Sequence, residues 1–143
     1  MFVRLLLGAI GLYELVAGVI MLIDPERWYA SVPGVTATGP MNHHFVIDIG
    51  LAFAASGVGM LMGLRKSPTA AAFALAGAAW PALHGLVHLW GWLSEGVPST
   101  IDIVATDLGA VMLPSFLGLA LALIAMRRAT LKSPGGSLLG IRA

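Results

Sequence analysis

Two histidines separated by three residues, His84 and His88, are the most distinctive chemical feature of the sequence. In a helix, residues four apart share a face, so the two imidazoles point the same way and suit chelation of one ion. The intervening Gly85-Leu86-Val87 lacks the glutamate of the zinc-protease motif. The pair therefore indicates a metal site of a different kind.

Other ionisable residues interrupt apolar stretches of the chain, where each costs at least about 2.5 kcal/mol near the centre of a membrane span. Four of them share helical phase with small residues, so we expect them to point into a bundle and to lie in its outer half with the histidine pair. They are Glu14, His44, Asp48 and Asp107. Asp102 projects away from Asp107 and is expected at the surface, as an early-turn acid favoured by the helix dipole. His43 lies off the His44/Asp48 face, although a one-residue error in phase would exchange the two histidines.

Together these side chains form a predicted nitrogen and oxygen ligand set for zinc, iron, copper or manganese. The predicted metal ligands are His44, Asp48, His84, His88, Glu14 and Asp107. The chain has no cysteine, so thiolate sites, iron–sulfur clusters and disulfides are excluded.

Two alternatives use the same residues without this metal shell. Haem would need two axial imidazoles that face each other, for example His44 with His84 or His88. Hydrogen-bonded pairs would need no cofactor: Asp48 would pair with His44, and Asp107 or Glu14 with His84. A proton relay is a further alternative, but the inner half of the predicted bundle holds no ionisable group to continue it.

The elements that position these residues follow from composition. Of 143 residues, 58% are hydrophobic and only 10% are charged, and mean hydropathy is +0.90, whereas soluble domains carry about 25% charge. These values exclude a soluble globular domain and a disordered chain. A net charge of +1 gives no field for phosphates, so no nucleic-acid partner is expected.

Four stretches are long and apolar enough to cross a bilayer. They are residues 2–23, 41–64, 68–93 and 101–126. The sequence predicts an all-α, polytopic four-helix bundle over residues 1–128, followed by a basic, Gly/Ser-rich tail over 129–143. Glu14 interrupts the first stretch and no signal-peptidase site follows, so we expect this stretch to be retained as a helix.

Basic residues set the expected orientation. Arg4, Arg65, Lys66, Arg127 and Arg128 fall at one end of the predicted bundle, and Arg27 at the other. The positive-inside rule then places both termini in the cytoplasm of a multi-pass protein of the bacterial inner (plasma) membrane.

Small residues and prolines predict how the helices pack. Glycine and alanine recur along every span, which is typical of close helix packing in lipid. Pro81 and Pro114 have no backbone N–H, so the carbonyls of Gly77 and Ala110 lose their helical donors and need new ones.

Two segments resemble small four-helix bacterial membrane proteins of the DoxX-like type. One runs from Gly11 to Gly18 and leads to Asp24-Pro25, and the other covers Gly63 to Ala72, with its basic turn and alanine-rich helix start. The resemblance covers about a fifth of the chain. It implies a four-helix membrane fold and assigns no catalytic residue.

The function predicted from these residues is that of a membrane metalloprotein, with an oxidoreductase or other metalloenzyme role on a lipophilic substrate or quinone. The alternative is a non-enzymatic accessory subunit, since short loops and an Ala/Gly-rich surface fit contact with membrane protein partners or a homo-oligomer.

Overall fold

The computed structural model describes residues 1–131, and all their regular secondary structure is helical. The segments are α1 (Phe2–Ile23), α2 (Pro25–Ser31), η1 (Val35–Thr38), α3 (His43–Met62), α4 (Pro68–Glu95), α5 (Ile101–Ala105), η2 (Thr106–Met112) and α6 (Leu113–Thr130). The segment η2 is a π-helix that joins α5 to α6 without a break. The predicted tail lies outside the described residues from position 132 onward.

Side-chain caps explain where three helices begin. Asp24 accepts a hydrogen bond from the backbone N–H of Arg27, and Pro25 occupies the first turn of α2. Ser67 caps α4 in the same way. Asn42 caps α3 through the N–H of Phe45. Thr100 occupies the N-cap position of α5, but its side chain makes no capping bond.

Four helices are long and apolar enough to cross a membrane, as predicted: α1, α3, α4 and the continuous α5–η2–α6 unit. Two features differ from the prediction. The connection after α1, expected as a loop, contains α2 and η1. The fourth span continues to Thr130 instead of ending at Met126.

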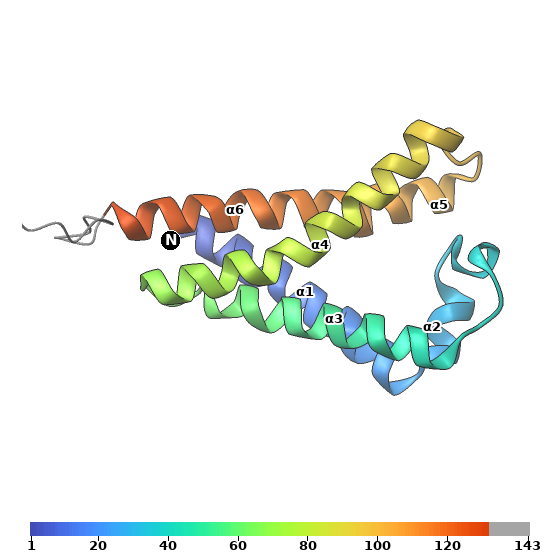
Figure 1. Ribbon diagram of the computed structural model, residues 1–143, viewed down its shortest axis with the longest axis horizontal. Coiled ribbons are helices and arrows are strands. Elements are labelled where there is room, and N and C mark those ends of the chain that lie inside the picture. The colour runs from blue at the N-terminus through green and yellow to red at the C-terminus, as the bar shows by residue number, and fades with distance from the viewer. Residues whose placement is uncertain (132–143) are drawn as a thin grey trace, which may run out of the picture.

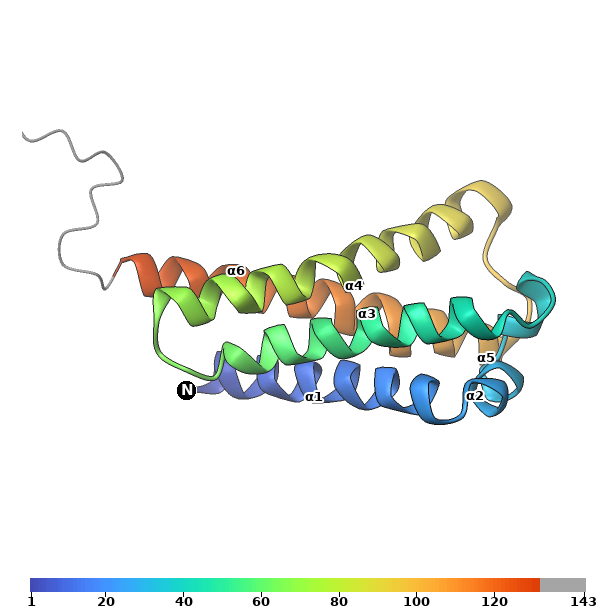
Figure 2. The same cartoon turned by 60° about the horizontal axis from the view of Figure 1, so that its bottom comes forward.

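The long helices form a closed ring of contacts in which α1 packs on α3, α3 on α4, α4 on α6, and α6 on α1. The N-terminus, the α3–α4 connection and the end of α6 lie at one end of the bundle (Figure 2). The opposite end holds α2 and α5 and is called the α2 end below. Towards the α2 end, the second half of α4 diverges from α3 (Figure 1) and contacts η2.

Glycines bring the helices into backbone contact, which confirms the small-residue packing. A Cβ on Gly18 would lie 2.5 Å from the Gly50 carbonyl oxygen, and one on Gly57 would lie 2.5 Å from the Gly11 carbonyl oxygen. Between α3 and α4, a Cβ on Gly59 would lie 2.9 Å from the Cα of Gly77. These positions exclude any larger residue without separation of the helices. Gly109 is an exception among the glycines of the long helices, because a Cβ there would meet no atom within 4 Å.

Candidate functional site

Four ring-bearing residues recur every fourth position along the second half of α4. They are Trp80, His84, His88 and Trp92, all of them partly buried. Residues at this spacing lie on one face of a helix. That face carries the contacts with η2 and α3 that build the site.

Asp107 contacts the two members of this row that lie nearest the end of α4, His88 and Trp92. Its Oδ1 lies 3.0 Å from His88 Nδ1, and its Oδ2 accepts a 2.9 Å hydrogen bond from Trp92 Nε1. The carboxyl is buried, so both oxygens find partners where water is largely excluded. The π-helix η2 carries this residue against α4.

The contact with Asp107 fixes the tautomer of His88. An ionised carboxylate only accepts hydrogen bonds, so Nδ1 of His88 carries the proton. In the neutral ring, Nε2 then holds a free lone pair. This is the arrangement that prepares an imidazole as a base, a hydrogen-bond acceptor or a ligand.

His84 lies within a column of aromatic rings. It stacks on Trp80 with ring centres 5.2 Å apart and planes 9° from parallel, and it meets His88 edge to face at 4.8 Å. Phe53 of α3 contacts both Trp80 and His84 edge to face. The described contacts of His84 are thus with rings, and its polar edge remains available to a ligand.

The structure corrects the predicted orientation of α3. The side chains of His44 and Asp48 are 87% and 54% exposed, and they lie 3.4 Å apart on the outer face. The reason is helical phase: Gly50 and Gly57 occupy the face against α1, and Asp48 lies about 200° around the helix from Gly50. His44 is therefore not placed to oppose His84 or His88 as a haem ligand. His44 and Asp48 are neighbours, but not the buried hydrogen-bonded pair that was predicted, because both side chains are exposed. Asp107 pairs with His88 and not with His84.

His43 also lies outside the bundle. Its Nδ1 is 2.7 Å from Glu26 Oε1, which ties the start of α3 to α2. A hydrogen bond with its own backbone and another with His43 hold the pKa of the Glu26 carboxyl below its ordinary value. Tyr29 of α2 donates to the Gly39 carbonyl and fixes the same connection. Asp102 is exposed in the first turn of α5, as predicted.

Glu14 points into the bundle, as predicted, and is 1% exposed. Its Oε2 has no hydrogen-bond partner. Within residues 1–131, no three His, Asp or Glu side chains lie close enough together to hold a metal ion. The six expected ligands are therefore separated in the structure. His44 and Asp48 lie on the exposed face of α3, and Glu14 is buried. In the remaining group, His88 contacts both His84 and Asp107.

Tyr13 supplies the hydrogen-bond donor that Pro114 removes. Its hydroxyl donates to the carbonyl oxygen of Ala110 at 2.6 Å. This contact confirms that the freed carbonyl finds a new donor. Neither Tyr13 nor Phe53 was expected at the site. Trp80 and Trp92 could have been predicted as members of the site, because they continue the four-residue spacing of His84 and His88 along α4.

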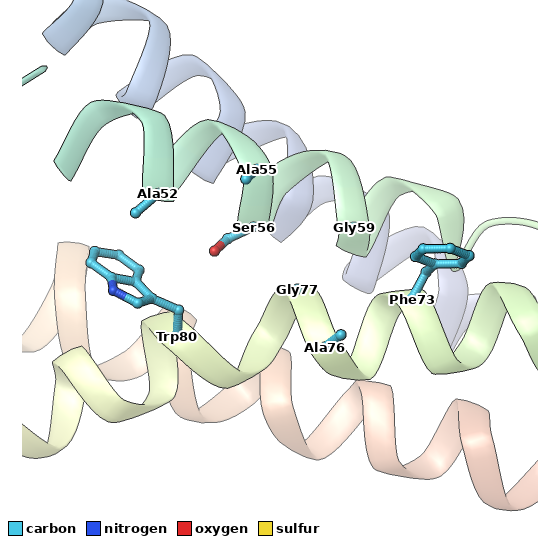
Figure 3. Close-up of a pocket in the computed structure, with 8 residues that line it drawn as sticks. All are labelled: Ala52, Ala55, Ser56, Gly59, Phe73, Ala76, Gly77 and Trp80. Carbon is cyan, nitrogen blue, oxygen red and sulfur yellow. The ribbon is translucent and has the colours of Figure 1, made fainter. Parts of the chain in front are cut away.

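A groove between α3 and α4 begins at Trp80. Its volume is about 370 Å³, and Trp80 and Phe73 lie near its opposite ends, with the Ser56 hydroxyl between them (Figure 3). The remaining lining residues are small: Ala52, Ala55, Gly59, Ala76 and Gly77. Trp80 thus belongs both to the groove and to the aromatic column.

Comparison with known proteins finds no family model, no curated protein and no solved structure that matches the chain. The resemblance to DoxX-like proteins stays a prediction. Function is therefore argued from the geometry of the site.

Proposed function

We propose that this chain is a multi-pass protein of a bacterial inner membrane that binds a flat, lipid-soluble molecule of the quinone class in the α3–α4 groove. Four helices of suitable length and hydropathy support the membrane assignment. The start of α1, the end of α6 and the α3–α4 connection, which contains Arg65 and Lys66, lie at one end of the bundle, and this favours a cytoplasmic location for both termini. The His84, His88 and Asp107 group then lies in the outer half, whereas the groove lies in the cytoplasmic half of α3 and α4.

The observation that carries the proposal is the contact between Trp80 and His84. Trp80 lines the groove, and His84 stacks on it at 5.2 Å. A planar ring packed against Trp80 would gain stacking energy. Its oxygen substituents would lie near an imidazole, which donates and accepts hydrogen bonds.

The groove suits the rest of such a molecule. Its lining is apolar except for Ser56, and small residues leave room for a chain of methylene groups. The Ser56 hydroxyl offers one hydrogen-bond donor to a ligand oxygen. A ligand from the bilayer would enter sideways, without crossing water.

The row on α4 gives the bound ring a route for proton exchange. A hydroxyl of the reduced ligand would pass its proton to a nitrogen of His84, leaving the electron pair on the ligand oxygen. His88 lies next along the row, and Asp107 stabilises the proton on His88. The chemistry proposed here is binding and proton exchange.

A matched pair of groove variants tests the proposal. Ala55 lines the groove, whereas Val58 on the same helix is an exposed apolar residue outside it. The protein is reconstituted in lipid nanodiscs and titrated with a short-tailed benzoquinone, with tryptophan fluorescence as the readout. We expect saturable quenching that Ala55→Phe weakens at least tenfold and Val58→Phe leaves unchanged. Quenching without saturation, or the same affinity in both variants, would overturn the proposal.

A further inference from the structure

Glu14 is a second chemical site, separate from the quinone groove. It is the one buried side chain within residues 1–131 that has a fully buried polar atom, Oε2, without a hydrogen-bond partner. Its side chain is almost completely enclosed. An enclosed polar atom without a partner in a well-packed bundle needs a physical explanation.

Glu14 lies on α1 between two close contacts of that helix with α3. The flanking Gly11 and Gly18 press against α3 at Gly57 and Gly50. One turn before Glu14, Ile10 lies 3.4 Å from the position of a Cβ on Gly118 of α6. Glu14 therefore lies on the part of α1 that packs against α3 with the two backbones close together, and α6 packs beside it at Ile10.

The titratable groups on the elements around Glu14 are engaged or distant. On its own helix, Tyr13 donates to Ala110 and Arg4 lies at the N-terminal end. Asp107 of η2 is held by His88 and Trp92. The others are exposed or partly exposed near the ends of the bundle: Glu26, Arg27 and Tyr29 on α2, His43, His44 and Asp48 on α3, and Arg127 and Arg128 on α6. None of them forms an ion pair with Glu14.

We infer that Glu14 is a proton-binding site inside the bundle, occupied by a proton at neutral pH. Burial of a carboxylate anion without a partner costs far more than burial of the neutral acid. The carboxyl thus remains protonated while the helices stay packed. It releases its proton only when α1 separates enough from α3 and α6 to admit water.

Infrared spectroscopy of the full chain in lipid tests this inference directly. A protonated carboxyl has a carbonyl stretching band that the ionised form lacks. We expect the difference spectrum between the wild type and Glu14→Gln at neutral pH to contain this band, with a frequency shift in heavy water. Glu95→Gln is the matched control, because Glu95 is exposed at the end of α4 and its loss should leave the band in place.

Other outcomes would overturn the inference. An absent acid band at neutral pH would show that Glu14 is ionised and paired. A band that disappears when sodium replaces choline in the buffer would show a metal-cation site. If Glu14→Gln does not fold, Glu14→Asp retains the carboxyl, and the band should then change frequency and persist.

Discussion

The hydroxyl of Tyr13 in α1 donates to the carbonyl oxygen of Ala110 in η2, across 97 positions of the chain. The bond links the first helix to the π-helical turn just before Pro114. We expect Tyr13→Phe to lower the free energy of unfolding by about 0.6–1.7 kcal/mol, the range for hydrogen bonds between membrane helices. Thermal unfolding in detergent measures the effect.

Tyr29→Phe provides the control for the tyrosine prediction. It removes the same hydroxyl from a bond to Gly39, in the connection between α2 and α3. Water can replace that bond more easily, so the change in stability should be smaller. Equal stability of Tyr13→Phe and the wild type would contradict the role assigned to the contact.

The close contact between α1 and α3 predicts that Gly→Ala has opposite effects on stability at two positions, Gly57 inside the contact and Gly91 outside it. Gly57→Ala places a Cβ 2.5 Å from the backbone of α1 and should destabilise the fold by about 1–3 kcal/mol. Gly91→Ala on α4 meets no atom within 4 Å and should be neutral or stabilise by up to about 1 kcal/mol. Unfolding midpoints of the two variants in one detergent compare them. Similar unfolding midpoints for the two variants would argue against the close backbone contact between α1 and α3.

Asp107→Asn tests the link between the carboxylate and the proposed ligand. An amide offers one acceptor oxygen, so it cannot accept from both His88 and Trp92 as the carboxylate does. With the orientation of His88 lost, we expect quinone affinity to fall roughly tenfold, or about 1.4 kcal/mol. Indole emission should shift as Trp92 loses its acceptor. Asp102→Asn, at an exposed position, should change neither quantity.

The contact between Glu26 and His43 predicts a pH effect at the α2 end. The pKa of Glu26 is lowered from 4.5 by a bond with its own backbone and by His43. A lowered pKa means that the contact stabilises the fold above about pH 4.5. This contribution is lost as the pH falls through the lowered pKa.

Thermal unfolding across acidic pH measures this loss. The difference in unfolding temperature between the wild type and Glu26→Gln should shrink as the pH falls. A difference that grows towards low pH would contradict the assignment.

The number of long helices and their small-residue contacts could be predicted from the sequence, because both follow from local composition. The orientation of α3 did not follow from its hydrophobic pattern. Its exposed and buried faces are both apolar, so periodicity alone does not separate them. Gly50 and Gly57, which contact α1, were the usable signal for that orientation.

Three members of the site could be predicted from the sequence: His84, His88 and Asp107. The four-residue spacing of His84 and His88 identified their shared face, and Asp107 was expected to point inward. Its contact with His88 depends on η2, because a π-helix changes the angle between successive side chains. Helical phase calculated for a regular α-helix does not include that change.

The length of α4 has a consequence for the surrounding lipid. With 28 residues at 1.5 Å each, the helix measures about 42 Å, against a hydrocarbon core of about 30 Å. A helix of this length fits the membrane only by tilting, bending or projecting beyond it. The row from Trp80 to Trp92 runs from the middle of this helix towards its end, along the half that diverges from α3 (Figure 1). A change in bilayer thickness would therefore change the tilt of α4 and its angle to α3. A thinner membrane would alter the geometry of the site without a change in sequence.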